Sequence, residues 1–166
     1  MAQITLGGNP VNTSGDLPSV GSAAPAFALT GNDLGEVTSA GLAGQRVVLN
    51  IFPSVDTAVC ATSVRTFNER AASLDNTAIV NVSADLPFAQ GRFCGAEGIE
   101  NAITASTFRN PEFLADYGVG MTDGKFHGLC ARAVVVLDES GNVLHNEMVA
   151  EIANEPDYDA AIASLG

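Results

Sequence analysis

Positively charged side chains are scarce in this chain of 166 residues, which has 7 lysines and arginines against 19 aspartates and glutamates. The formal net charge is −12 at pH 7, and a surface of that sign repels phosphate backbones and anionic lipid headgroups. We therefore expect no nucleic-acid partner and no binding to a membrane surface. The scarcity also makes any arginine near a reactive group notable.

Long apolar runs are absent too, since no stretch approaches the roughly 18–20 residues that span a bilayer. The first ten residues have neither a basic start nor an apolar signal core, which leads us to expect a cytoplasmic location. Three cysteines are present, Cys60, Cys94 and Cys130, and no two form a Cys-x-x-Cys motif. Structural disulfides are uncommon in the cytosol, so this odd number favours transient redox chemistry or burial.

The length and composition indicate one globular domain over residues 1–166. Apolar residues make up 46% of the chain and charged residues only 16%, and a chain of this length can bury about 70% of its unfolded surface. No repeat or linker divides the sequence.

Apolar periodicity predicts an α/β fold of the thioredoxin-like type, with a central mixed sheet, helices on both faces and an N-terminal β-hairpin. The predicted strands are 4–6 and 11–13 (the hairpin), 27–29 and 36–38 (short edge strands), 47–52, 77–83, 133–137 and 143–148. The predicted helices are 58–74, 87–94, 112–117 and 156–165, with Thr57 as an N-cap.

Cys60 is the best candidate for a reactive residue. It lies at the first turn of a predicted helix, after a predicted buried strand and the loop that begins at Pro53. Unpaired N–H groups and the helix dipole favour a thiolate there, and open α/β sheets place ligand crevices at the carboxyl ends of their strands. Because nucleophilicity falls as a thiol becomes more acidic, large acceleration also needs substrate positioning and donors aimed at developing charge. The alternative is a buried, inert cysteine.

Three separated blocks carry a resemblance to a known family. They are Asn-Ile-Phe-Pro-Ser-Val-Asp-Thr-Ala-Val-Cys at 50–60, Ser-Ala-Asp-Leu-Pro-Phe-Ala-Gln-Gly-Arg-Phe-Cys at 83–94 and Ala-Arg-Ala-Val-Val-Val at 131–136. Together they resemble the bacterial thiol peroxidases, the atypical two-cysteine branch of the peroxiredoxins. The likeness extends from residues 8–11 to 155–158, essentially the whole chain.

The resemblance implies a role for each matching residue. Cys60 would be the peroxidatic cysteine, which attacks hydrogen peroxide or an organic hydroperoxide and becomes a sulfenic acid. Thr57 would hydrogen-bond the thiolate and the peroxide, and Pro53 would shield the sulfur from water. Arg132 would face the thiolate and stabilise the departing oxygen. No cofactor is implied.

Cys94 would be the resolving cysteine, which forms an intramolecular disulfide with Cys60 that thioredoxin reduces. A homodimer is what the family usually forms. Disulfide geometry demands Cα atoms about 4.4–6.8 Å apart, so we expect the first turn at Cys60, the segment around Cys94, or both to unwind in each cycle. A permanent structural bridge, worth about 4 kcal/mol in the chain-entropy model, is the alternative.

Other chemistry remains open at this stage. Cys130 matches no family role, and we expect a small buried filler. His127 could complete a Cys3His zinc set with the three cysteines, although the usual Cys-x-x-Cys pair is missing. A Cys–His hydrolase would need Cys60 beside His127 or His145, and we expect His145 to be a surface residue. A general thiol–disulfide oxidoreductase and a non-enzymatic redox-sensing module also remain, and Cys60→Ser separates the module from the peroxidase.

Overall fold

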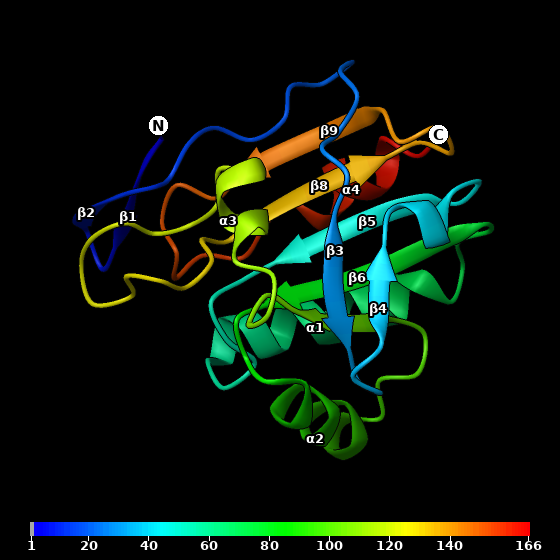
Figure 1. The fold of residues 1–166 in the computed structure, drawn as a ribbon, viewed down its shortest axis with the longest axis horizontal. Helices are drawn as coiled ribbons and strands as arrows, with labels where there is room; N and C mark the ends of the chain where they lie inside the picture. The colour runs from blue at the N-terminus through cyan, green and yellow to red at the C-terminus, as the bar shows by residue number, and fades with distance from the viewer. Residues whose placement is uncertain (1) are drawn as a thin grey trace.

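A seven-stranded mixed sheet forms the centre of the computed structural model, which describes residues 2–166 (Figure 1). Its strand order is β4-β3-β7-β6-β5-β8-β9. The strands are β3 (Ala28–Gly31), β4 (Glu36–Thr38), β5 (Arg46–Ile51), β6 (Thr77–Ser83), β7 (Ile103–Ser106), β8 (Ala133–Leu137) and β9 (Val143–Met148). The helices are α1 (Ala58–Ala71), α2 (Pro87–Glu97), α3 (Glu112–Asp116) and α4 (Tyr158–Ala163), with a 3₁₀ turn, η1 (Ala40–Leu42).

The middle of the sheet is parallel, because β5, β6 and β7 are joined by the crossover helices α1 and α2. β8 then pairs antiparallel with β5, and β9 returns antiparallel beside β8. The central strands are buried on both faces, as their nearly continuous apolar sequences require. This order places the carboxyl end of β5, and the loop after it, between the ends of β6 and β8.

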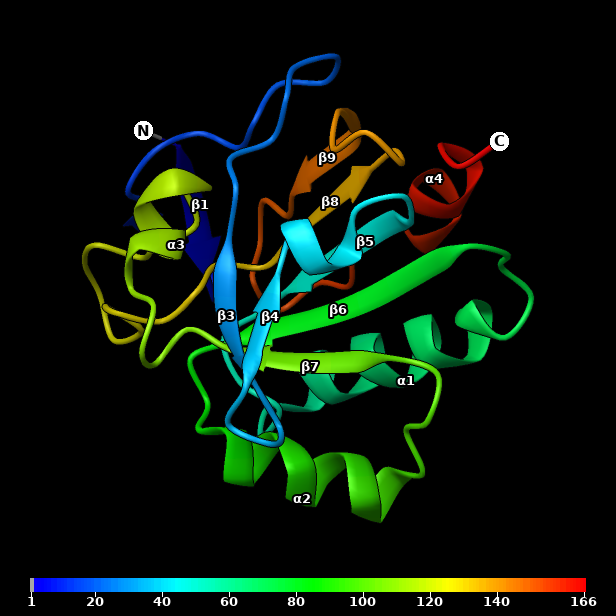
Figure 2. The ribbon, with the colours of Figure 1, turned by 45° about the vertical axis from the view of Figure 1, so that its right-hand side comes forward.

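Two apolar layers cover the sheet, so helices lie on both faces (Figure 2). On one face, Phe67 of α1 and Ala161 of α4 pack against strand residues such as Val48 and Val136. On the other, Phe113 of α3 packs with Phe27 and the opposite side chains of the same strands. The predicted fold class is therefore confirmed.

The N-terminal hairpin is a separate two-stranded sheet of β1 (Gln3–Leu6) and β2 (Asn9–Asn12). Its turn residues Gly7 and Gly8 have φ of 58° and 81°, the left-handed region that tight hairpin turns need and that glycine adopts without strain. The hairpin prediction is confirmed, with a two-residue turn. In Figure 1 the hairpin lies at the end of the molecule from which the loop before β8 also projects.

Two expectations need correction, and one strand was not predicted. β3 is an internal strand between β4 and β7, not an edge strand, and β7 has no predicted counterpart. His145 is half-buried on β9, not a surface residue, and its Nε2 has no hydrogen-bond partner among the described residues.

Within residues 2–166, no helix is long and apolar enough to cross a membrane.

Candidate active site

Cys60 is the third residue of α1, and its side chain is completely buried. It packs in a small apolar cluster with Phe52 at the end of β5, Val55 in the following loop, Val64 of α1 and Phe93 of α2. Its position in the first helical turn puts the sulfur near N–H groups that lack intrahelical partners and near the positive end of the helix dipole.

Arg132, the residue just before β8, points its guanidinium at that sulfur. Its side chain is buried, Nη2 lies 3.3 Å from the Cys60 Sγ, and Nε donates to the Ile152 carbonyl at 2.8 Å. No Asp or Glu within residues 2–166 forms an ion pair with Arg132. A buried guanidinium favours a negative charge nearby, and the atom placed to carry that charge is the sulfur.

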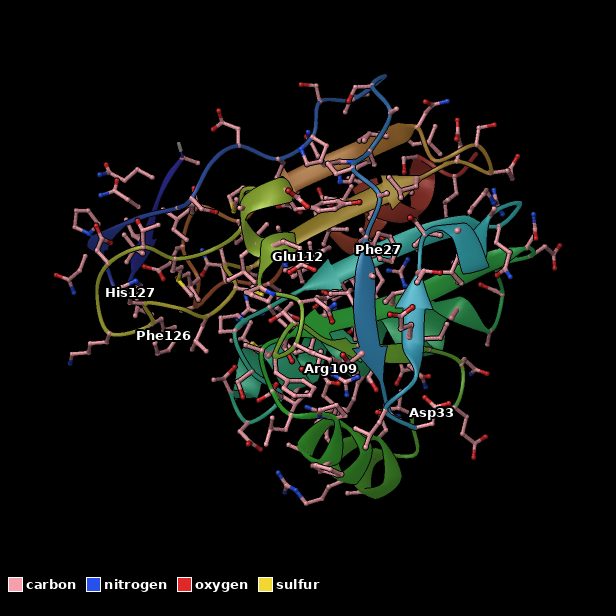
Figure 3. All side chains as sticks on the ribbon, viewed as in Figure 1. Phe27, Asp33, Arg109, Glu112, Phe126 and His127 are labelled. Atoms are coloured by element: carbon pink, nitrogen blue, oxygen red, sulfur yellow. The ribbon has the colours of Figure 1, made fainter. Side chains whose placement is uncertain are left out.

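The remaining guanidinium nitrogen, Nη1 of Arg132, is buried and has no partner among the described residues. Arg132 also borders an open, mostly apolar pocket of about 210 Å³. Four separate segments build its wall: Leu6; Pro53, Thr57, Ala58 and Val59; Phe126; Ile152 and Ala153. Figure 3 shows Phe126 on the loop that lies beside the hairpin. The site thus combines a buried thiol, an unused cationic donor and a pocket that a small molecule could enter.

Pro53 and Thr57 both line this pocket, whereas the buried Cys60 does not. Thr57 occupies the N-cap position of α1, but its hydroxyl does not cap the helix. Instead the hydroxyl donates to the Ser54 carbonyl at 3.1 Å, and the Thr57 carbonyl accepts from the Ala61 N–H at 3.0 Å. The expectation of an N-cap is therefore right in position and wrong in side-chain contact. Among residues 2–166, no hydrogen bond joins the Thr57 hydroxyl to the Cys60 sulfur, which is contacted by Arg132 instead.

Asp85 holds the loop before Cys60 in place, and sequence reasoning missed it. Its carboxylate accepts from the Ser54 hydroxyl at 2.7 Å, the Val55 N–H at 2.9 Å and the Ser83 hydroxyl at 2.6 Å. The loop after β5 is thereby tied to the end of β6, two residues before α2 begins. The available signal was the Ser-x-Asp pattern at the carboxyl end of a predicted strand, beside the strand that precedes Cys60.

Cys94 lies on α2 and is not on the pocket, but its half-buried side chain packs against the same apolar cluster as Cys60. Both thiols are free. Burial raises the pKa of the Cys94 thiol, and a hydrogen bond with the Thr104 side chain offsets part of that rise. An exposed ion pair between Arg92 of α2 and Asp56 of the active-site loop, 3.2 Å long, also links the two segments. Each cysteine therefore sits in an ordered helix, and the thiols are separate.

Cys130 is completely buried in the apolar layer beneath α3, so the expectation of a buried residue is confirmed. Burial raises its thiol pKa to about 12, which disfavours the reactive thiolate. His127 is exposed on the loop before β8 (Figure 3). Among the described residues, no hydrogen bond joins Cys60 to His127 or His145, and no three His, Cys, Asp or Glu side chains gather as a metal site would require.

This fold is that of the redoxin class. A family model described as Redoxin matches residues 19–162, so the chain belongs to that family. The structure of a peroxiredoxin-like protein from Aquifex aeolicus superimposes with a TM-score of 0.93 at 38% identity, covering 99% of this chain and 96% of the other. A thiol peroxidase from Chromobacterium violaceum, 22% identical, shares the fold with a TM-score of 0.91 and coverages of 98% and 94%.

Within this class the chain belongs to the thiol peroxidase branch of the peroxiredoxins. Thiol peroxidases from Mycobacterium bovis and Mycobacterium tuberculosis are each 62% identical to it over 166 residues, covering 100% of this chain and 99% of theirs. The resemblance drawn from three sequence blocks is thus confirmed over the full length.

Proposed function

We propose that this thiol-dependent peroxidase reduces hydrogen peroxide and organic hydroperoxides with Cys60 as its peroxidatic residue. One observation carries the proposal: the guanidinium of Arg132, a residue that lines the pocket, lies 3.3 Å from the Cys60 sulfur and has a second nitrogen without a hydrogen-bond partner among the described residues. A thiolate and a free cationic donor side by side suit the cleavage of an O–O bond, in which one oxygen is attacked and the other leaves with negative charge.

In the first step, the Cys60 thiolate attacks the terminal oxygen of the hydroperoxide. The S–O bond forms as the O–O bond breaks, sulfur is oxidised by two electrons to the sulfenic acid, and the departing alkoxide or hydroxide takes a proton to leave as alcohol or water. Arg132 stabilises the departing oxygen through the guanidinium nitrogen that the folded protein leaves unused. Burial strengthens that interaction, because water does not screen it.

Thr57 and Pro53 complete the peroxide site in this proposal. Thr57 holds its hydroxyl hydrogen on the Ser54 carbonyl, so its oxygen accepts a hydrogen bond from the terminal O–H of the peroxide. Pro53 has no backbone N–H and contributes an apolar ring to the wall. Together they keep bulk water from the reacting atoms, which protects the sulfenic acid until it is resolved.

In the second step, the Cys94 thiolate attacks the sulfenic sulfur of Cys60. A disulfide forms, and the hydroxide that leaves takes a proton to become water. Because each cysteine is part of a separate helix, α2, the first turn of α1, or both must unwind. A dithiol reductant of the thioredoxin class then reduces the disulfide and restores both thiols.

The chain works as one domain over residues 1–166, as a homodimer, in the cytoplasm.

Counting thiols tests the two-cysteine cycle. One equivalent of hydrogen peroxide or cumene hydroperoxide is added to the fully reduced protein, and free thiols are titrated after denaturation. Since the chain has three cysteines, the proposal expects a single remaining thiol, on Cys130, and an intramolecular Cys60–Cys94 bridge in the peptide map. The loss of one thiol with a persistent sulfenic acid would show that Cys94 takes no part. Cys60→Ser should consume no peroxide.

A further inference from the structure

The N-terminal hairpin forms one wall of the peroxide pocket, although it is no part of the central sheet. Leu6, the last residue of β1, lines the pocket together with Pro53 and with residues 57–59 just before Cys60. Leu6 and Phe126 both pack against a small apolar cluster under the hairpin that is separate from the main core. The position of this wall therefore depends on what fastens the hairpin to the rest of the molecule.

Glu151 makes three of the hydrogen bonds that fasten the hairpin, beside the backbone pairing of Thr5 with Ala150 and Ile152. Its carboxylate accepts from the N–H groups of Gly7 at 3.2 Å and Gly8 at 2.8 Å, and from the hydroxyl of Thr5 at 3.0 Å. It also accepts from the N–H of Ala153, on its own segment, at 3.0 Å. The positive φ of both glycines turns their N–H groups toward one anion, an arrangement that forms a natural anion cradle. The carboxylate thus joins the hairpin turn to the pocket-lining residue Ala153.

These donors keep the carboxylate charged. The N–H of Ala153, then those of Gly8 and Gly7, lower the pKa of Glu151 to about 2. The carboxylate is therefore ionised, and accepts all four hydrogen bonds, throughout the neutral pH range.

A second set of hydrogen bonds joins the hairpin to the Arg132 guanidinium. Ile152 donates its N–H to the Thr5 carbonyl at 2.9 Å, and its own carbonyl accepts from the Arg132 Nε at 2.8 Å. Ile152 therefore joins β1 to Arg132 through two hydrogen bonds that do not involve the Glu151 carboxylate.

We propose that Glu151 is a positioning residue that holds the hairpin as a wall of the pocket, and thereby sets how well a bulky apolar hydroperoxide is used relative to hydrogen peroxide. This inference rests on the proposed function, because it assumes that the pocket beside Cys60 admits the peroxide. A bulky peroxide contacts the Leu6 wall, whereas hydrogen peroxide is too small to need it. Releasing the hairpin should therefore affect the two substrates unequally.

Glu151→Gln is the first test. The amide replaces one carboxylate oxygen with an NH2 group that faces donors, so about half of the contacts are lost. We expect kcat/KM for cumene hydroperoxide to fall about tenfold, mainly through KM, which is the size of effect that one lost apolar contact has in a binding pocket. The value for hydrogen peroxide should fall less than threefold. Glu151→Asp, which keeps the charge on a shorter side chain, should lie between Gln and the parent protein.

Leu6→Ala and Glu36→Gln make the test specific. Leu6→Ala removes the wall and keeps the carboxylate, so it should lower the cumene-to-hydrogen-peroxide ratio by a similar factor. Glu36→Gln removes an exposed carboxylate on β4 and should leave the ratio unchanged. If Glu151 acts through the wall, the Leu6→Ala/Glu151→Gln double variant should be little worse than either single one. Circular dichroism checks that each variant is folded.

The outcomes are distinguishable. An unchanged ratio in folded Glu151→Gln, or losses in the double variant that simply multiply, would overturn the positioning role and leave the peroxidase proposal intact. Failure of the parent protein to consume either peroxide would instead overturn the proposed function itself.

Discussion

At the residue scale, the most unusual group in the molecule is the buried guanidinium of Arg132. A buried charge without a counter-charge is costly, yet among residues 2–166 no carboxylate pairs with it, and one of its nitrogens has no partner. In the proposed mechanism, a Cys60 thiolate balances this charge, and a peroxide oxygen supplies the partner that the second nitrogen lacks. On this proposal, the folded state keeps a donor that is used only during the reaction.

Arg132→Lys tests the role proposed for the guanidinium. An ammonium cannot contact the Ile152 carbonyl, the sulfur and the departing oxygen in one plane, as the guanidinium can. We expect kcat/KM for hydrogen peroxide to fall about 10²–10³-fold, the usual effect of losing a donor to developing negative charge. Arg109→Lys, at an exposed arginine that stacks over Phe108, is the matched control. Steady-state kinetics within twofold of the parent for Arg132→Lys would remove the guanidinium from the mechanism.

The residues of the candidate site differ in how far they could be predicted from the sequence. The position of Cys60 in the first turn of a helix was predictable from the strand and helix patterns around it. Its contact with Arg132 spans 72 positions, so it came only from the family resemblance. Asp85 and Glu151 were missed because, in a sequence this acidic, a carboxylate that accepts backbone N–H groups looks like any other surface carboxylate. Only the fold brings their donors together.

At the scale of single elements, α2 is the segment whose stability should control disulfide formation. It contains Gly91 and Gly95, and a glycine inside a helix costs about 1 kcal/mol relative to alanine. A Cβ added at Gly95 would meet no heavy atom within 4 Å. Alanine there should therefore stabilise the helix without disturbing its packing.

Gly95→Ala should slow the formation of the Cys60–Cys94 disulfide up to about fivefold, because about 1 kcal/mol more is needed to unwind α2. Formation of the sulfenic acid should be unchanged, since α2 need not open for that step. Ala96→Gly, at the next exposed position, should have the opposite effect. Stopped-flow measurements separate the two phases, and equal disulfide rates in all three proteins would show that α2 stays folded during resolution.

Apolar patterning predicted some strands correctly and missed or misplaced others. The ranges of β6, β8 and β9 were predicted as observed, because β6 and β8 are apolar runs and β9 follows β8 directly after the turn residues 138–142. β7 was missed because Ile-Thr-Ala-Ser has one large apolar residue, and its pairing with β6 lies outside any local window. β3 was mistaken for an edge strand because strand order depends on pairing between distant segments, here with β7.

At the scale of the whole molecule, ionised carboxylates fasten the N-terminal hairpin to segments far along the chain. Glu151 binds the turn of the hairpin, and Asp123 accepts from the backbone and side chain of Asn12 in β2 at 2.9 and 2.8 Å. Backbone hydrogen bonds lower the pKa of both carboxylates, that of Glu151 from 4.5 to about 2. A carboxylate that is more acidic in the folded than in the unfolded state stabilises the fold while it is ionised.

The direction of this pKa shift determines how the stability of the fold depends on pH. Glu151 should contribute its full stabilising free energy above pH 4.5. That contribution should be lost as the pH falls toward 2, because the Glu151 carboxylate takes up a proton at a higher pH in the unfolded chain than in the folded one. Glu151→Gln should be less stable at pH 7 and should show a shallower loss of stability between these limits. Urea unfolding followed by circular dichroism measures both. Parallel pH profiles for the two proteins would mean that the carboxylate makes no such contribution.

The most direct test of the central claim is to locate the first oxidised atom. Cys94→Ser cannot form the disulfide, so its sulfenic acid should persist long enough to be trapped with dimedone after one equivalent of hydrogen peroxide. The account predicts a single adduct per chain, on Cys60, with Cys130 unmodified, and no adduct when Cys60→Ser is added. An adduct on Cys130, or rapid peroxide consumption without Cys60, would contradict it.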